Sequence, residues 1–264
     1  MKSLNTKKIG VIVACRMKSS RLKKKAILPI NGQPSILLCL DSSLRISNVD
    51  LVVLATSVLK EDDILENFIL GRKVKLWRGD PDDVIQRYLG ACEAFGIDVV
   101  IRVTADCPYI SYEVAEILLR HHLKTNADYT AARKVTLGTG CEIYSTHALR
   151  KVIQYLGRAE YSEYMTWYFR NNPDIFKIEL VDLPGLLIRD YRLTLDYPED
   201  LEMFNKLYAA LEIKNFTPSL KNIFKILDER KSISNINAHL SLRYKTDLDL
   251  IKKLKQVTKI NISK

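Results

Sequence analysis

The sequence predicts an α/β fold, with a Rossmann-like, mostly parallel sheet and helices on both of its faces. Three short apolar runs, at 9–14 (IGVIVA), 51–56 (LVVLAT) and 99–104 (VVIRVT), have the composition of strands that are buried on both sides. Longer segments with a helical spacing of apolar residues separate these runs. Strands that alternate with such helices are typical of βαβ units, which build parallel sheets.

The remaining elements follow from composition and from residues that start or stop helices. Gly71 and Gly96 end two predicted helices, because glycine readily adopts the left-handed conformation. Pro198 begins the last long helix, where its missing N–H costs nothing. Predicted helices span 34–45, 61–70, 82–95, 112–124, 146–156, 162–170 and 198–211, and further predicted strands span 74–77, 142–145, 176–181 and 192–195. No linker divides the chain, so we expect a main domain over 1–211 and a helical appendage over 212–264 that packs on it.

The 264-residue chain carries a net charge of +10, concentrated near its two ends. Residues 1–25 hold nine basic and no acidic side chains, and residues 213–264 hold twelve basic and four acidic ones. A basic surface favours anionic partners such as a nucleotide, an acidic sugar or nucleic acid. For the C-terminal excess we favour a solvated basic face over a binding surface.

Cysteine usage and hydropathy indicate a cytoplasmic protein that does not enter a membrane. The five cysteines are an odd number and show no CxxC spacing, which argues against a disulfide framework and a structural zinc site. The apolar run at 9–14 is shorter than the core of a signal peptide. No stretch approaches the length of a transmembrane helix.

A basic loop follows the first predicted strand, at the sheet edge where α/β folds bind their ligands. Residues 15–25 (CRMKSSRLKKK) combine arginines, lysines and two serines. Arginine forks match phosphate oxygens and lysine supplies compact positive charge, so the composition suits a triphosphate. The loop is neither a P-loop nor a dinucleotide fingerprint. By composition alone, a solvated loop without a ligand is an equal alternative.

Two aspartates follow other predicted strands. Asp106 lies just beyond the strand at 99–104, and Asp196 lies just beyond the one at 192–195. Mg²⁺ is usually bound by one or two carboxylates together with substrate phosphates and water. The pair therefore predicts a Mg²⁺ site beside the phosphate loop. Each aspartate considered alone could instead form a turn or cap a helix.

Five motifs occur in the order found in one known family. They are VACRMKSSRLKKK, LVVLATS, LWRGDPDDVIQRY, VVIRVTADCPYI and YRLTLDYPEDLEMF. The sequence resembles the cytidylyltransferases typified by CMP-Kdo and CMP-sialate synthetases, and most closely their spore-coat-polysaccharide branch. The resemblance covers about residues 8–210, with a weaker match at 233–239 (ISNINAH) to which no chemistry is assigned.

The resemblance implies a fold of the nucleotide-diphospho-sugar transferase type and a Mg²⁺-dependent transfer of CMP from CTP to an acidic sugar. Pyrophosphate would leave, and the product would serve surface polysaccharide or glycan biosynthesis. The residues implied to act on the triphosphate are Arg16, Arg21 and Lys25. The implied nucleotide contacts are Cys15, Ser19, Thr56, Ser57, Arg78, Gly79 and Asp83. Asp106 and Asp196 match the metal ligands, and the acceptor side would hold Glu142, Arg192, Tyr164 and, as a further basic residue of that half, Arg189.

Departures from the family pattern bear mainly on the acceptor. Lys18 and Lys23-Lys24 replace a glycine and a Pro-Gly pair of the loop. Thr139 and Tyr164 replace an acidic residue and a histidine on the acceptor side, which keeps a phosphonate or sugar phosphate open as acceptor.

Two other functions compete with cytidylyl transfer. A glycosyltransferase of related fold would also bind a metal through carboxylates, but the sequence has no persuasive DxD at a strand end, because its Asp-containing pairs lie at helix starts. A nucleic-acid-binding module would fit the charge, but the sequence has no helix-turn-helix, RRM or zinc pattern. We expect CTP and an anionic small molecule as partners, without nucleic acid or membrane insertion, and leave a homodimer open.

Overall fold

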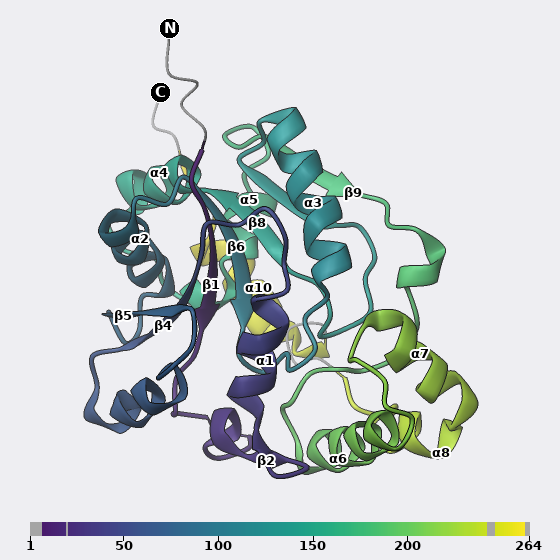
Figure 1. Cartoon of the computed structure of the whole chain (residues 1–264). Helices are drawn as coiled ribbons and strands as arrows, with labels where there is room; N and C mark the ends of the chain where they lie inside the picture. Colours follow the sequence, from purple (N-terminus) through teal and green to yellow (C-terminus); the bar gives the residue numbers. More distant parts are fainter. Residues whose placement is uncertain (1–6, 20, 242–245, 262–264) are drawn as a thin grey trace, which may run out of the picture.

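A seven-stranded sheet forms the centre of the computed structural model, which describes residues 7–19, 21–241 and 246–261 (Figure 1). Its strand order is β5-β4-β1-β6-β8-β7-β9. The strands are β1 (Ile9–Ala14), β4 (Leu51–Ser57), β5 (Val74–Gly79), β6 (Val99–Thr104), β7 (Tyr129–Ala132), β8 (Glu142–Ser145) and β9 (Ile178–Val181). The first four are mutually parallel, β8 is antiparallel to β6 and β7, and β7 is parallel to β9. The predicted, mostly parallel sheet is confirmed.

Helices cover both faces of this sheet, because alternate residues of its central strands point to opposite sides. Ile12 of β1 joins one apolar core, and Val11 and Val13 join the other. The helices of the Ile12 face are α2 (Val84–Phe95), α4 (Thr146–Leu156) and α5 (Thr166–Arg170). Those of the Val11 face are α1 (Ser35–Ser43), α3 (Tyr112–Thr125), α6 (Pro198–Ile213), α7 (Leu220–Glu229) and α8 (Lys231–Ser234).

Short elements complete the described structure. They are the two-stranded ribbon β2 (Pro29–Ile30) and β3 (Gln33–Pro34), the 3₁₀ helices η1 (Lys25–Ile27), η2 (Lys60–Phe68), η3 (Ser162–Tyr164) and η4 (Gly185–Leu187), and the C-terminal helix α10 (Leu248–Val257). Within the described residues, no helix combines the length and the apolar character needed to cross a membrane.

The segment after residue 212 shares the core of the preceding chain. Ile223, Phe224 and Leu227 of α7 are buried in the same core as β1, and Figure 1 shows α7 and α8 beside α6. Further on, the Asn172 amide donates to the Thr258 carbonyl at 2.8 Å and its oxygen accepts from the Ile260 N–H at 2.9 Å, which holds the end of α10 against α5. The boundary between a domain at 1–211 and an appendage at 212–264 stays a prediction.

Three sequence-based assignments were wrong in detail. The helix predicted at 61–70 is the 3₁₀ helix η2, and the one predicted at 162–170 is divided into η3 and α5. The strand predicted at 192–195 makes only an isolated bridge, because Leu193 N–H donates to Leu137 at 2.8 Å and Leu195 N–H donates to Asp106 at 2.7 Å. The segment 192–195 thus forms hydrogen bonds to two different segments, at Leu137 and Asp106, instead of pairing along one strand. The strand β7 was not predicted, since four residues (YTAA) give little pattern.

Candidate active site

The candidate site lies where β1 and β6 end, at the edge predicted for ligands. Asp106 follows β6, and its carbonyl oxygen accepts hydrogen bonds from Leu195 N–H at 2.7 Å and from Thr194 Oγ1 at 3.2 Å. These bonds fasten the segment that carries Asp196 to the end of β6. Gly138, at φ +86°, allows a neighbouring loop to approach this segment, because a Cβ there would lie 2.0 Å from the Leu193 carbonyl oxygen.

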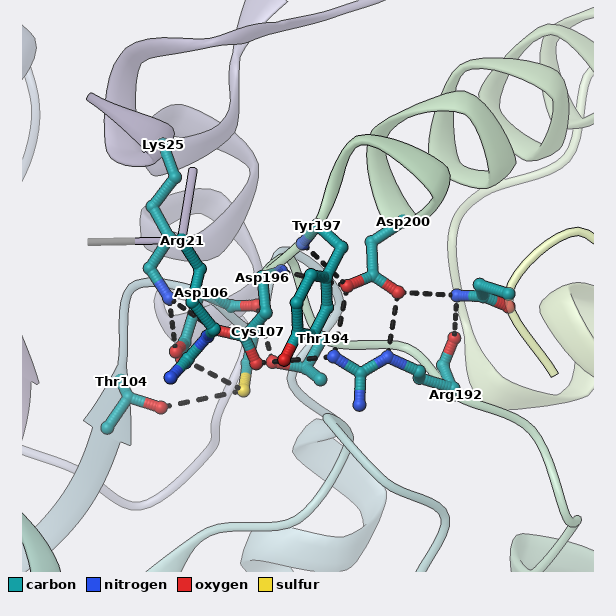
Figure 2. Close-up of polar contacts among 11 residues, drawn as sticks. Arg21, Lys25, Thr104, Asp106, Cys107, Arg192, Thr194, Asp196, Tyr197 and Asp200 are labelled. Atoms are coloured by element: carbon teal, nitrogen blue, oxygen red, sulfur yellow. Dashed lines mark hydrogen bonds and ion pairs between the residues drawn. The ribbon is translucent and has the colours of Figure 1, made fainter. Parts of the chain in front are cut away.

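The basic loop after β1 contacts both aspartates (Figure 2). Lys25 Nζ lies 2.8 Å from Asp106 Oδ2 and 2.8 Å from Asp196 Oδ1, and Arg21 Nη2 lies 2.6 Å from Asp196 Oδ1. Ser35 Oγ of α1 donates to the Lys25 carbonyl at 2.8 Å, which anchors the end of the loop. Four predicted site residues from three distant parts of the sequence therefore meet.

The charges of this cluster stabilise one another. Burial by itself raises the pKa of the Asp106 carboxyl, but the nearby Lys25 charge and hydrogen bonds from Lys25, Thr104 and Cys107 outweigh it and lower that pKa to about 2. Burial opposes the charge of Lys25, yet Asp106 and Asp196 raise the pKa of its ammonium group above its ordinary value. The two groups are therefore both charged at neutral pH.

The two carboxylates fit a divalent cation. Their oxygens converge on one positive group, the Lys25 ammonium, so a cation placed between them would reach both. Among the described residues, no group of three or more His, Cys, Asp and Glu side chains has a metal-binding arrangement. A Mg²⁺ ion here would take the rest of its ligands from phosphates and water, as Mg²⁺ commonly does.

The guanidinium group of Arg192 binds carboxylates of the protein itself. Its Nε and Nη2 donate to the two Asp200 oxygens at 2.8 and 3.0 Å, and Nη2 also lies 3.3 Å from Asp196 Oδ2 (Figure 2). Only Nη1, itself buried, has no hydrogen-bond partner among the described residues. Arg189 contacts Asp228 of α7 at 3.3 Å and lies over the Phe224 ring. This geometry does not support the expectation that either fork binds an acceptor carboxylate.

An open pocket of about 460 Å³ adjoins the basic loop. Its lining residues are Arg16, Lys18, Asp82, Glu160, Tyr161 and Glu163. Arg16 donates to the Pro81 carbonyl and lies 3.8 Å from Asp82, so the loop is joined here to the segment between β5 and α2. Ser19 is partly buried in the same loop. The pocket offers room for a substrate beside two basic side chains.

Several predicted nucleotide contacts have partners within the protein. Ser57 Oγ donates to the buried Asp62, which also accepts from Met17 N–H at 2.7 Å and so ties the basic loop to the end of β4. The predicted contact Thr56, next to Ser57, is buried, and its hydroxyl has no hydrogen-bond partner among the described residues. The Cys15 thiol is buried, which raises its pKa, so it stays protonated.

The predicted nucleotide contacts at the end of β5 and just after it also interact with other groups of the protein. Arg78 binds Asp63 at 2.6 Å and Glu66 at 2.9 Å, both in η2. Asp83 caps α2 by accepting from Gln86 N–H at 3.0 Å, and it also accepts from Ala159 N–H at 3.1 Å. A Cβ at Gly79 would lie 3.0 Å from the Arg87 side chain, so this glycine permits a close approach.

Glu142 lies in a buried polar cluster on β6, β7, β8 and α5. Its carboxylate accepts from Arg102 at 2.7 Å, Tyr129 at 2.7 Å, Tyr144 at 3.1 Å and Thr166. Burial raises the pKa of the Glu142 carboxyl, but the Arg102 charge together with hydrogen bonds from Thr166, Tyr129 and Tyr144 outweighs burial and lowers that pKa. Arg102 Nη2 also donates to the Glu163 carbonyl at 3.0 Å, which places the cluster behind the 460 Å³ pocket. The predicted acceptor residue Tyr164 follows Glu163 in η3.

Sequence reasoning missed four residues of these networks: Asp62, Arg102, Asp200 and Asn237, whose side-chain amide donates to Asp200 Oδ1 at 2.8 Å. Arg102 had a visible signal, because an arginine inside the apolar run VVIRVT requires a buried partner. Asp200 also had one, since an acidic residue in the first turn after Tyr197-Pro198 is a helix-capping pattern. Asp62 shows no such pattern, and Asn237 lies in the 233–239 match, to which the sequence assigned no chemistry.

Comparison with known proteins points to one kind of enzyme. Residues 10–261 match the family described as cytidylyltransferase. The spore coat polysaccharide biosynthesis protein SpsF of Bacillus subtilis is 32% identical over 75% of this chain and 85% of its own length. A 3-deoxy-manno-octulosonate cytidylyltransferase of Francisella tularensis subsp. novicida is 33% identical over 41% of this chain and 43% of its own length. A solved cytidylyltransferase from Leptospira borgpetersenii has a TM-score of 0.79 and 25% identity, covering 89% of this chain and 99% of that one.

Proposed function

Because this chain belongs to the cytidylyltransferase family and is a nucleotidyltransferase, we propose that it transfers CMP from CTP to an acidic sugar with release of pyrophosphate. The observation that carries the proposal is the meeting of Lys25, Asp106 and Asp196 at the end of β6, with Arg21 beside them. Positive groups for a triphosphate and carboxylates for a divalent ion thus lie at one place.

The proposed reaction is an in-line displacement at the α-phosphorus of CTP. A bond forms between an acceptor hydroxyl oxygen and that phosphorus, the bond to the pyrophosphate oxygen breaks, and the hydroxyl proton passes to solvent. Such chemistry depends on positioning and charge neutralisation more than on covalent catalysis. Arg21 and Lys25 neutralise the negative charge that grows on pyrophosphate, and Arg16 contributes from the pocket side.

Asp106 and Asp196 are the proposed ligands of Mg²⁺. When bound, the ion supplies positive charge to the phosphates and lowers the pKa of the acceptor hydroxyl. Lys25 now binds both carboxylates at 2.8 Å, so it must release them when a divalent ion enters. Its flexible side chain can then reach a phosphate oxygen, which is the role of a compact, mobile positive charge.

The acidic acceptor is supported by the named substrate of the Francisella relative and by two basic side chains of the pocket, Arg16 and Lys18. The pocket also presents Glu160 and Glu163, whose carboxylates can accept hydrogen bonds from sugar hydroxyls. Glu142 contributes indirectly, by holding Arg102 and thereby the Glu163 main chain.

Pyrophosphate release tests this function. The purified chain is incubated with Mg²⁺, each of the four nucleoside triphosphates and a panel of carboxylated sugars, sugar phosphates and phosphonates. We expect release with CTP and a carboxylated sugar and none from the matched Asp106→Asn variant. Equal rates with UTP or GTP would contradict cytidylyl transfer, and transfer only to phosphorylated acceptors would contradict the acidic sugar.

A further inference from the structure

The C-terminal segment reaches the candidate metal site through the buried side chain of Asn237. This residue follows α8 and is 1% exposed. Its Nδ2 donates to the Arg192 carbonyl oxygen at 3.0 Å and to Asp200 Oδ1 at 2.8 Å. Both partners are acceptors only, so the amide nitrogen has to face them.

Both carboxylate oxygens of Asp200 accept more than one hydrogen bond. Its Oδ1 accepts from Arg192 Nε and Asn237 Nδ2, and its Oδ2 accepts from Arg192 Nη2 and from two main-chain N–H groups. Those two groups belong to Asp196, at 2.9 Å, and to Tyr197, at 3.0 Å. The carboxylate is fully buried, so these donors from the protein hold it in position.

Asp200 and Arg192 together fix Asp196. Its main-chain N–H is held by Asp200, and its side-chain oxygen Oδ2 is contacted by Arg192 Nη2 at 3.3 Å. Its other oxygen, Oδ1, is the one that faces Lys25 and Arg21 (Figure 2). A shift of Asp200 or Arg192 would therefore turn the Asp196 carboxylate relative to Arg21 and Lys25 of the basic loop.

We propose that Asn237 is a positioning residue, which orients the Asp196 carboxylate through Asp200 and Arg192 without touching substrate. The C-terminal segment is thereby part of the catalytic unit. This rests on the proposed function, since it takes Asp196 as a metal ligand. Groups that orient a metal ligand commonly account for about 10–100-fold in metal affinity.

Mn²⁺ binding tests the inference without requiring an acceptor. Free Mn²⁺ is followed by electron paramagnetic resonance while the metal is titrated into the full chain. We expect Asn237→Ala to weaken Mn²⁺ binding about tenfold. Asn235→Ala is the matched control, because Asn235 lies two residues away and is exposed. A folded Asn237→Ala protein with wild-type Mn²⁺ affinity would overturn the proposal.

A double-mutant cycle separates positioning from general stability. If Asn237 acts through Asp200, its removal should change Mn²⁺ affinity much less in an Asp200→Asn background, because the shared carboxylate is gone. Full additivity would overturn the proposal. If Asn237→Ala is too unstable to purify, Asn237→Ser carries the same test, with weaker Mn²⁺ binding expected and unchanged binding contradicting it. Asp196→Asn tests the proposed metal site itself, since wild-type Mn²⁺ binding there would refute that site whatever Asn237 does.

Discussion

Two neighbouring aspartate clusters of this molecule differ in how tightly they are held. Asp106 and Asp196 are bound by Lys25 and Arg21, long side chains from a loop, and the Lys25 and Asp106 side chains remain 18% and 24% exposed. Asp200 is fully buried and held by Arg192, Asn237 and main-chain N–H groups. The first cluster can exchange its positive partner for a metal ion or a phosphate. Asp200 is buried with its donors, so it serves as a fixed support for Asp196. We call Asp106 and Asp196 the exchangeable cluster, and Asp200 with its donors the fixed cluster.

Neutralising the exchangeable cluster should have the largest effect on activity. Asp106→Asn or Asp196→Asn should each lower kcat by about 10³-fold, because each removes charge stabilisation at the reacting phosphate. The protein should remain folded, since both side chains keep their volume. Steady-state kinetics with circular dichroism measure this. Asp182→Asn is the control, because that side chain is 79% exposed, and a loss of activity in it comparable to the site variants would undermine the assignment.

Neutralising the fixed cluster should act on stability instead. Asp200→Asn should reduce the free energy of unfolding by about 3 kcal/mol, because it leaves the buried Arg192 charge poorly compensated. The matched variant is Asp228→Asn, whose partner Arg189 is 39% exposed, and there we expect a cost below about 1 kcal/mol. Urea unfolding compares the two. Similar costs in both variants would remove the distinction between the clusters.

The close approach of the Gly138 main chain to the Leu193 carbonyl should also contribute to the stability of the protein. Gly138→Ala should cost about 2–3 kcal/mol, because φ is +86° and the new Cβ would meet the Leu193 carbonyl oxygen at 2.0 Å. Gly185→Ala is the control, since a Cβ there meets no atom within 4 Å. Thermal unfolding followed by circular dichroism gives the comparison, and an unchanged melting temperature in Gly138→Ala would contradict the close approach.

Acid should weaken the exchangeable cluster by a smaller amount. The pKa of Asp106 is lowered to about 2 by Lys25, from an ordinary 3.8, so the folded state binds this proton less readily than the unfolded state. The resulting stabilisation is present above about pH 4 and is lost as the pH falls toward 2. It amounts to at most about 2 kcal/mol, reduced by solvent at a partly exposed carboxylate. Urea unfolding between pH 6 and 3 should show this slope in the wild type and a smaller one in Lys25→Met; equal slopes would count against the pairing.

The mostly parallel sheet, the basic residues Arg21 and Lys25 and the carboxylates Asp106 and Asp196 could be predicted from the sequence. Apolar runs such as IGVIVA and VVIRVT can be satisfied only by strands buried on both faces, and ligands gather where such strands end. The order of the motifs placed Arg21, Lys25, Asp106 and Asp196 in one site, and the structure brings these four residues together. Local pattern was sufficient for Asp106 and the basic loop, which follow real strands, whereas Asp196 was expected after a strand at 192–195 that makes only an isolated bridge, and the motif resemblance assigned it to the site.

Which of these charges can reach a ligand depended on how the chain folds. Arg21, Arg78 and Arg192 carry the same guanidinium and each binds a carboxylate of the protein, yet the Arg21 side chain is 37% exposed, whereas the Arg192 side chain, held by Asp200, is only 4% exposed. Asn237 has no pattern that connects it to Asp200, 37 residues away. The reason is physical: a hydrogen bond forms only when chain folding brings a donor and an acceptor to within about 3 Å, and residue type does not record that distance.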